Sequence, residues 1–219
     1  MSSAFIFDMN GTMVDDMAYH GDAWSNIINE ALKGNLSREQ VNKEMYGKNE
    51  EVLERIFGKG RFTQEEMYKI SMIKEDAYQQ AFKPHLKLID GLDNFLKRAH
   101  TIGIPMAIGT AAIPYNIGFV MDNLDINHYF TTIISANDVT MSKPHPETFL
   151  LCAEGMRVSP ENCIVFEDAP KGVEAALNAG MKAVAVTTMH ADADFAKYGN
   201  VLFCINDYND PRLASLLKD

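Results

Sequence analysis

Four short stretches of this sequence carry polar side chains that could do chemistry together. Each lies at or beyond the end of an apolar run, and they contribute Asp8, Asn10, Thr110, Lys143, Glu167 and Asp168. Carboxylates gathered at one place repel one another unless a cation lies between them, and oxygen ligands favour a hard ion such as Mg²⁺. A hydroxyl and a lysine supply a donor and a positive charge that can hold a phosphoryl oxygen. These residue types predict a Mg²⁺-dependent phosphoryl-transfer site with Asp8 as the nucleophile.

The surrounding pattern predicts that these side chains meet at one edge of a parallel sheet. Short apolar runs alternate with helical patterns after Pro84, and this alternation is typical of parallel strands covered by helices on both faces. The expected strands are 4–7, 104–108, 132–135, 163–166, 183–186 and 201–204, and the expected helices are 92–100, 113–123, 146–155 and 172–179. Ligands bind at the carboxyl ends of the strands in such sheets, so the four stretches should converge there.

Residues 16–83 have a different texture, which predicts an all-helical insert. Apolar residues recur at helical spacing, and Ser37 with Gln40 and Thr63 with Glu66 resemble capping boxes. The strand before the insert cannot bury a core alone, so the flanking pieces must share one sheet. We therefore predict an α/β fold with a Rossmann-like parallel sheet, formed by residues 1–15 and 84–219, and a helical cap domain at 16–83. The insert would act as a lid over the site.

The composition narrows the choice of partners. Hydrophobic residues make up 47% of the chain, which supports a packed interior, and the formal net charge is −10. That charge argues against nucleic acid or an anionic membrane as a partner and leaves a small phosphorylated metabolite. Three cysteines without paired or metal-type spacing are typical of reduced thiols. No segment has a leader pattern or transmembrane length, so a cytoplasmic protein is expected, and a monomer is compatible with the sequence.

The four stretches also resemble a known family. FDMNGTMVDD at 7–16, IGT at 108–110, SKPHPETF at 142–149 and FEDAPKGVEAALNAGM at 166–181 resemble, in order and spacing, the motifs of the haloacid dehalogenase (HAD) superfamily. The insert resembles the C1 cap of its β-phosphoglucomutase-like subgroup. The resemblance implies an aspartyl-phosphate on Asp8 and a phosphate held by Thr110 and Lys143. The Mg²⁺ ligands that it implies are Asp8, Asn10 through its main-chain carbonyl, Glu167 and Asp168.

Asn10 departs from the pattern of that family. Its phosphatases and phosphomutases usually carry aspartate at this position, where the side chain protonates the leaving group and later activates water. An amide cannot exchange protons near neutral pH, and loss of a positioned acid–base group lowers rates by ~10²–10⁴-fold. Two explanations are open: an engineered substitution that traps an inactive form, or a natural variant with slow or altered chemistry.

The resemblance further implies substrate contacts in both domains, at Gly11, Thr12, His20, Gly47, Lys48, Lys74 and Ala111. The Thr12 hydroxyl is expected to stabilise its own turn, with substrate contact as the alternative. His20 and Lys74 fall where the mutases place a hydrogen-bonded pair that couples cap closure to catalysis. Lys74 also lies in a charged run, KEDAY, which is typical of a solvated helix face.

The loop MYGKNEE at 45–51 bears on the type of reaction. A β-phosphoglucomutase is expected to carry a basic residue before the loop glycine and an arginine three residues after it, whereas these positions are Tyr46 and Glu50. A glutamate would repel a second phosphate, so we predict a Mg²⁺-dependent phosphatase of small phosphate monoesters, sugar phosphates among them. The alternatives are a β-phosphoglucomutase-type phosphomutase and a catalytically impaired phosphometabolite-binding protein. Lys48 leaves a phosphonatase, which needs a cap lysine, as a minor alternative.

Overall fold

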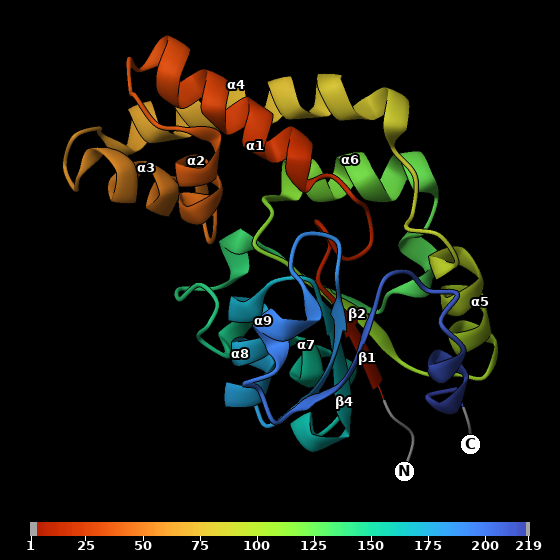
Figure 1. Cartoon of the computed structure of the whole chain (residues 1–219). Coiled ribbons are helices and arrows are strands. Elements are labelled where there is room, and N and C mark those ends of the chain that lie inside the picture. Colours follow the sequence, from red (N-terminus) through yellow and green to blue (C-terminus); the bar gives the residue numbers. More distant parts are fainter. Residues whose placement is uncertain (1–3, 218–219) are drawn as a thin grey trace. The chain divides into compact units, whose positions relative to one another are not determined.

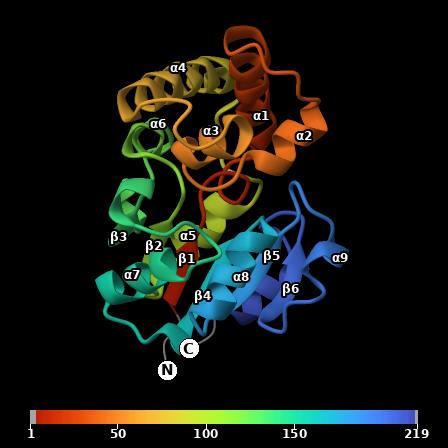
Figure 2. The ribbon, with the colours of Figure 1, turned by 90° about the vertical axis from the view of Figure 1, so that its left-hand side faces the viewer.

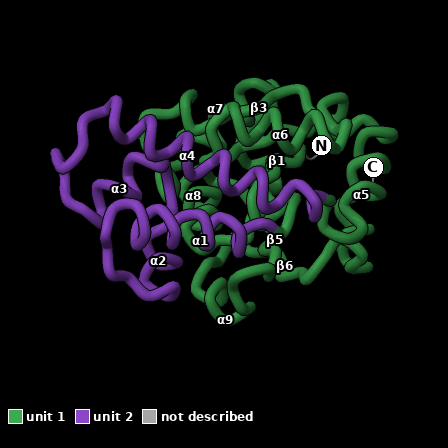
Figure 3. Tube along the Cα trace, turned by 90° about the horizontal axis from the view of Figure 1, so that it is seen from above, with its two compact units in different colours: residues 1–15, 87–219 green, residues 16–86 purple. Residues whose placement is uncertain are grey.

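The computed structural model describes residues 4–217, and the chain divides into two compact units (Figures 1 and 3). Unit 1 contains residues 1–15 and 87–219, and unit 2 contains Asp16–Leu86. The second junction lies three residues beyond the expected boundary at 83/84. The 3₁₀ turn Lys83–His85, which follows the last helix of the insert directly, accounts for this difference.

Unit 1 is built on a parallel sheet with the strand order β3-β2-β1-β4-β5-β6. The strands are β1 (Ala4–Phe7), β2 (Met106–Gly109), β3 (Thr132–Ile134), β4 (Cys163–Glu167), β5 (Lys182–Val186) and β6 (Val201–Ile205). All their pairings are parallel. Each expected strand is present, and β1 lies between β2 and β4. The loops that follow these three neighbouring strands therefore leave the same edge of the sheet.

Helices cover both faces of this sheet, as Figures 1 and 2 show. The helices of unit 1 are α5 (Leu92–Thr101), α6 (Pro114–Leu124), α7 (Glu147–Met156), α8 (Pro170–Asn178) and α9 (Asp192–Phe195). Short 3₁₀ turns occur at Asn127–Tyr129, Ala136–Asp138, Pro160–Asn162 and Pro211–Ser215. α7 packs on β1, β2 and β3, and α8 packs on β4 and β5. The sequence pattern predicted the four longer helices but not α9.

The alternation of side chains in β1 explains why this strand is apolar at every position. Ala4 and Ile6 point into a core cluster with Phe149 of α7. Phe5 points to the opposite face, where its ring stacks on Phe95 of α5 with centroids 5.4 Å apart. Successive strand residues face opposite sides of a sheet, and both sides are buried in this unit. The strand that carries the first polar loop is thus held by two cores.

Unit 2 is helical throughout. Its elements are α1 (Met17–Ser25), a π-helical segment (Asn26–Ala31), α2 (Arg38–Glu44), α3 (Asn49–Phe57) and α4 (Gln64–Phe82). They enclose an apolar core that includes Trp24, Ile28 and Leu53. Both expected capping boxes are present, at the start of α2 and of α4. Of the helices in residues 4–217, none combines the length and the apolar character that a bilayer span requires.

Candidate active site

The loop after β1 brings the first polar residues to the edge of the sheet. The amide of Asp8 donates to the carbonyl of Phe166 (3.0 Å) and so continues the pairing of β1 with β4. The chain then turns back, because the amide of Gly11 donates to the carbonyl of Val14 (2.8 Å). Asn10 is half-buried in this turn, and its backbone bridges to Val14. The turn fixes where the Asp8 carboxylate emerges.

Gly11 is required by a close approach within this loop. Its φ is +76°, in the left-handed region, and a Cβ added there would lie 2.2 Å from Oδ2 of Asp168. Any side chain at this position would therefore displace the Asp168 carboxylate as well as strain the backbone. The hydroxyl of Thr188 donates to the carbonyl of Gly11 (2.6 Å), which anchors the same turn to the segment after β5.

Lys143 joins two carboxylates at this edge. Its Nζ donates to Oδ1 of Asp8 (2.6 Å) and to Oε1 of Glu167 (2.7 Å), and only 10% of its side chain is exposed. Burial alone would lower the pKa of Lys143, but the attraction of the Asp8 and Glu167 carboxylates outweighs burial and raises this pKa above its ordinary value. Lys143 therefore stays positively charged at neutral pH.

Glu167 is held by the turn between β4 and α8. Its Oε2 accepts a hydrogen bond from the amide of Ala169 (2.8 Å), while Oε1 faces Lys143. A Cβ on Gly172, in the first turn of α8, would lie 1.8 Å from Oε1 of Glu167. The glycine therefore leaves the space that this carboxylate occupies. Glu167 contacts Lys143 directly in this arrangement.

Asp168 is bound by Thr12, which reaches it from the loop after β1. The Thr12 hydroxyl donates to Oδ1 of Asp168 (3.1 Å), and both residues are buried. This hydroxyl thus joins two loops, whereas the sequence predicted that it would stabilise its own turn. Burial, and then the charges of Glu167 and Asp8, raise the pKa of Asp168 well above its ordinary value. The site holds more negative charge than Lys143 neutralises.

This excess of negative charge is what a divalent cation would relieve. Among residues 4–217 there is no group of three His, Cys, Asp or Glu side chains placed so that they could hold a metal ion by themselves. Mg²⁺, however, is commonly bound by one or two carboxylates together with carbonyl oxygens and water. The oxygen ligands and the charge of this site therefore fit Mg²⁺.

Thr110 and Ala111 follow β2 at the same edge of the sheet. Phe7 pairs with Ile108 in the β1–β2 register. Asp8 directly follows Phe7, and Thr110 lies two residues after Ile108, so both residues leave the sheet at the same edge. The amide of Thr110 donates to the carbonyl of Ile134 (3.0 Å), and its hydroxyl accepts from the amide of Ala112 (3.1 Å). Thr110 is buried and Ala111 is half-buried. Thr110 thus forms a tight turn beside the loop that follows β1, which carries Asp8 and is called the Asp8 loop below.

A second polar cluster lies inside unit 2. Nζ of Lys74 lies 2.7 Å from Nδ1 of His20 and donates to Oε2 of Glu75 (3.0 Å). Lys74 is only 2% exposed. The solvated helix face predicted from its charged sequence neighbours is therefore wrong for this residue. Burial lowers the pKa of Lys74, against the opposing attraction of Glu75 and Asp16. The His20 ring stacks on Tyr78, with centroids 3.7 Å apart.

The loop before α3 is tied to this cluster. Gly47 has a φ of +74°, and the amide of Lys48 donates to Oε2 of Glu51 (3.0 Å) at the start of the helix. The side chain of Asn49 donates to Oε1 of Glu75 (2.7 Å), next to Lys74. Of the substrate contacts expected in unit 2, His20 and Lys74 thus lie in one polar cluster. Lys48 is next in sequence to Asn49, which contacts that cluster through Glu75.

The fold and these motifs agree with the chain's relatives. A protein-family model described as "Haloacid dehalogenase-like hydrolase" matches residues 5–186. The chain belongs to the haloacid dehalogenase-like hydrolases. This confirms the resemblance of the sequence motifs to that superfamily and its β-phosphoglucomutase-like subgroup, and the expected fold with a helical cap. The HAD protein is thus an enzyme of the phosphohydrolase type.

Individual relatives cover most of this HAD protein. A fructose-1-phosphate phosphatase of Escherichia coli is 30% identical over 204 residues, which cover 84% of this chain and 96% of the relative. The β-phosphoglucomutase of Bacillus subtilis is 31% identical over 198 residues, with coverages of 84% and 82%. The crystal structure of a β-phosphoglucomutase from Clostridium difficile has a TM-score of 0.84 at 25% identity, and covers 99% of this chain and 97% of that one.

Sequence reasoning did not identify Thr188, whose contact with Gly11 is given above, or Tyr208. Tyr208 lies in the segment after β6, and its hydroxyl donates to the carbonyl of Thr12 (3.1 Å). Only 5% of Tyr208 is exposed. The residue lies beyond the part of the HAD protein that the family model matches. A tyrosine among polar residues, as in INDYNDP at 205–211, carries no sequence signal for such a contact.

Proposed function

We propose that this chain is a Mg²⁺-dependent phosphatase of small phosphate monoesters, sugar phosphates in particular, that acts through an aspartyl-phosphate on Asp8. The observation that carries this proposal is the contact of Lys143 Nζ with Asp8 (2.6 Å) and Glu167 (2.7 Å), at the strand ends where Asp168 also lies. Relatives named as phosphatases of fructose 1-phosphate, of hexitol phosphates and of phosphorylated carbohydrates support sugar phosphates as the substrate class.

The chain's own residues have distinct roles in the proposed reaction. A carboxylate oxygen of Asp8 attacks the phosphorus, the bond from phosphorus to the ester oxygen breaks, and that oxygen takes a proton from solvent water and leaves as the alcohol. Lys143, which stays charged, and the Thr110 hydroxyl hold phosphoryl oxygens. Water then attacks the same phosphorus, so inorganic phosphate leaves and the Asp8 carboxylate is restored. Positioning and charge neutralisation supply most of the rate enhancement.

Mg²⁺ would be held by Asp8, Asp168 and the main-chain carbonyl of Asn10. Glu167 would act as a direct or water-mediated ligand, although in this structure its carboxylate binds Lys143 and the amide of Ala169. When bound, the ion supplies positive charge that neutralises the phosphoryl oxygens and the clustered carboxylates. Substrate contacts are assigned to Gly11, Thr12 and Ala111 in unit 1, and to His20, Gly47, Lys48 and Lys74 in unit 2.

Asn10 limits the proton transfers of this reaction. Its amide can neither protonate the leaving alcohol nor activate water, so we expect slow turnover in the chain as it stands. The Asn10→Asp substitution should raise kcat for an aryl phosphate in the presence of Mg²⁺ by ~10²–10⁴-fold. The assay measures release of p-nitrophenol. The matched control adds Asp8→Asn to the Asn10→Asp variant, and this double substitution should abolish turnover.

The outcomes of this assay separate the candidate functions. Equal activity with asparagine and aspartate at position 10 would remove the assignment of proton transfer to this residue. No turnover by the Asn10→Asp variant, together with tight binding of a sugar phosphate, would favour the phosphometabolite-binding protein. Among substrates, fructose 1-phosphate and hexitol phosphates should have higher kcat/KM values than the aryl phosphate. Higher values for the aryl phosphate than for every sugar phosphate would contradict the proposed substrate class.

One observation favours the phosphomutase alternative. The 2.7 Å contact of His20 with Lys74 joins the pair expected in the mutases. Glu50, in the first turn of α3, argues against a phosphomutase because its charge would repel a distal phosphate. The direct test adds Glu50→Arg to the Asn10→Asp variant, with isomerisation of β-glucose 1-phosphate as the readout. We expect no isomerisation by the Asn10→Asp variant. If adding Glu50→Arg also produces no isomerisation, the phosphatase remains the favoured function.

A further inference from the structure

We propose that Tyr208 is a positioning residue of this site: its hydroxyl holds the main chain of Thr12 and thereby sets the Asp168 carboxylate. The inference rests on the proposed function, in which Asp168 is a Mg²⁺ ligand. Tyr208 lies in the segment after β6, outside residues 5–186 and outside the four motifs of the family. The site would thus depend on a residue from the last part of the chain.

Two hydrogen bonds form the connection. The Tyr208 hydroxyl donates to the carbonyl oxygen of Thr12 (3.1 Å). The hydroxyl of the same threonine donates to Oδ1 of Asp168 (3.1 Å). Thr12 has no exposed surface. Without the Tyr208 hydroxyl, water would not readily reach the Thr12 carbonyl oxygen to replace the lost hydrogen bond. Tyr208 therefore holds the main chain of Thr12, and the side chain of Thr12 holds Asp168.

The backbone of Tyr208 is held in place. Its amide donates to the carbonyl of Asp90 (2.9 Å), and the amide of Ile89 donates to the carbonyl of Met13 (2.8 Å), so one segment contacts both Tyr208 and the Asp8 loop. A Cβ on Gly91 would lie 2.7 Å from the carbonyl carbon of Tyr208. This close approach leaves the backbone of residue 208 little room to shift.

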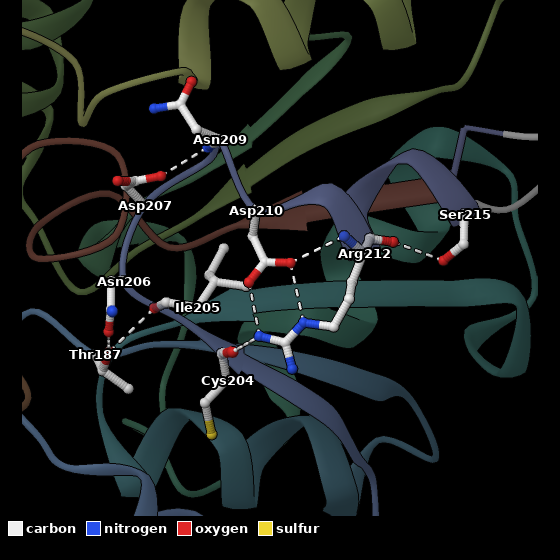
Figure 4. A network of polar contacts seen from close by, with 9 residues as sticks. All are labelled: Thr187, Cys204, Ile205, Asn206, Asp207, Asn209, Asp210, Arg212 and Ser215. Carbon is white, nitrogen blue, oxygen red and sulfur yellow. Dashed lines mark hydrogen bonds and ion pairs between the residues drawn. The ribbon is translucent and has the colours of Figure 1, made fainter.

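Polar contacts on both sides of Tyr208 fix the segment further, as Figure 4 shows. On one side, Oδ1 of Asn206 accepts from the Thr187 hydroxyl (2.7 Å). On the other, Arg212 donates to both carboxylate oxygens of Asp210 (2.9 and 2.7 Å) and to the carbonyl of Cys204 (2.6 Å). The segment is thus bound to β6 and to the end of β5.

The ring of Tyr208 packs in the aromatic core of unit 1. Its centroid lies 6.4 Å from that of Phe7, and 5.8 Å from those of Phe95 and Phe166. Burial, followed by the charges of Asp168 and Asp8, raises the pKa of Tyr208 well above its ordinary value. The hydroxyl therefore stays protonated and can donate a hydrogen bond. Packing alone would need only the ring, whereas the proposed role needs the hydroxyl.

Tyr208→Phe separates these two roles because phenylalanine keeps the ring and removes the oxygen. Tyr198→Phe is the matched control: Tyr198 is 8% exposed, and its hydroxyl donates to Glu174 (3.3 Å). Titration calorimetry with Mg²⁺ on the full chain should show a dissociation constant raised on the order of ten-fold by Tyr208→Phe, the effect usual for residues that orient metal ligands. Tyr198→Phe should leave it unchanged. A dissociation constant unchanged by Tyr208→Phe would overturn the proposal.

Hydrogen exchange provides a readout that needs neither metal nor turnover. Without Mg²⁺, Tyr208→Phe should speed exchange at the amides of Gly11 and Met13, which bond within the Asp8 loop, and Tyr198→Phe should not. If the parent chain binds no Mg²⁺, this comparison decides, and equal exchange overturns the proposal. A raised dissociation constant without phosphatase activity in the Asn10→Asp variant would reject the proposed function alone. Parent-like Mg²⁺ affinity of Tyr208→Phe, beside an active Asn10→Asp variant, would reject only the role of Tyr208.

Discussion

Nζ of Lys143 lies 2.6 Å from Oδ1 of Asp8, although 135 positions separate the two residues in the sequence. About 10% of each side chain is exposed, so the pair interacts where water screens it poorly. Glu167 accepts from the same ammonium group at 2.7 Å. The contact orients the proposed nucleophile and offsets part of the negative charge that the site gathers.

Removing this lysine should affect both stability and catalysis. Lys143→Met leaves the Asp8 and Glu167 carboxylates buried without the ammonium charge between them, so we expect the free energy of unfolding without metal to fall by about 3–5 kcal/mol. When it is added to the Asn10→Asp variant, kcat should fall by ~10²–10³-fold because a donor to the phosphoryl group is lost. Denaturant unfolding and the aryl phosphate assay measure the two effects. Lys97→Met, at an exposed position on α5, is the control and should change neither.

The same pair predicts how stability depends on pH. The pKa of Lys143 is raised in the folded state, so its contribution is fully present below the unfolded-state pKa of about 10.4 and is lost as the pH rises above that value. The loss should be about 1.4 kcal/mol per pH unit above this point. The measurement is the difference in unfolding free energy between the parent chain and Lys143→Met from about pH 8 to about pH 11.5. A difference that stays constant above pH ~10.4 would contradict the raised pKa.

Asp168 predicts a pH dependence of Mg²⁺ binding. Its pKa is raised in the folded state, so without metal its contribution to stability is greatest below the unfolded-state pKa of about 3.9 and declines as the pH rises. Mg²⁺ must compete with the proton at low pH and relieves the charge at high pH. The increase in Tm caused by Mg²⁺ should therefore grow between about pH 5 and about pH 8. An increase that is the same at both ends would argue against Asp168 as a ligand.

Gly11 offers a test of how closely the two loops approach. Gly11→Ala would place Cβ 2.2 Å from Oδ2 of Asp168, whereas a Cβ on Gly103 meets nothing within 4 Å at nearly the same φ, +77° against +76°. Gly103→Ala should cost only the backbone strain, about 1–2 kcal/mol. Gly11→Ala should cost more and should weaken Mg²⁺ binding as well. Equal losses of unfolding free energy, with unchanged Mg²⁺ affinity, would show that the carboxylate has room to move.

Local sequence patterns predicted most of the fold. The capping boxes at the starts of α2 and α4 form between residues three positions apart, so nothing distant was needed to predict them. The first helix of the insert was less predictable, because it changes to a π-helical segment at Asn26 without a breaking residue. Strand positions followed from short apolar runs, since parallel strands buried on both faces need apolar side chains throughout.

The sequence by itself determined the parallel sheet, the helical insert and the four polar stretches, because strand periodicity, helix capping and motif spacing are local properties of the chain. Only the tertiary structure decided that Lys74 is buried, that the Thr12 hydroxyl binds Asp168 and that Tyr208 reaches Thr12 across 196 positions of sequence. These contacts depend on which surfaces pack together. A residue's neighbours along the chain do not specify its neighbours in space.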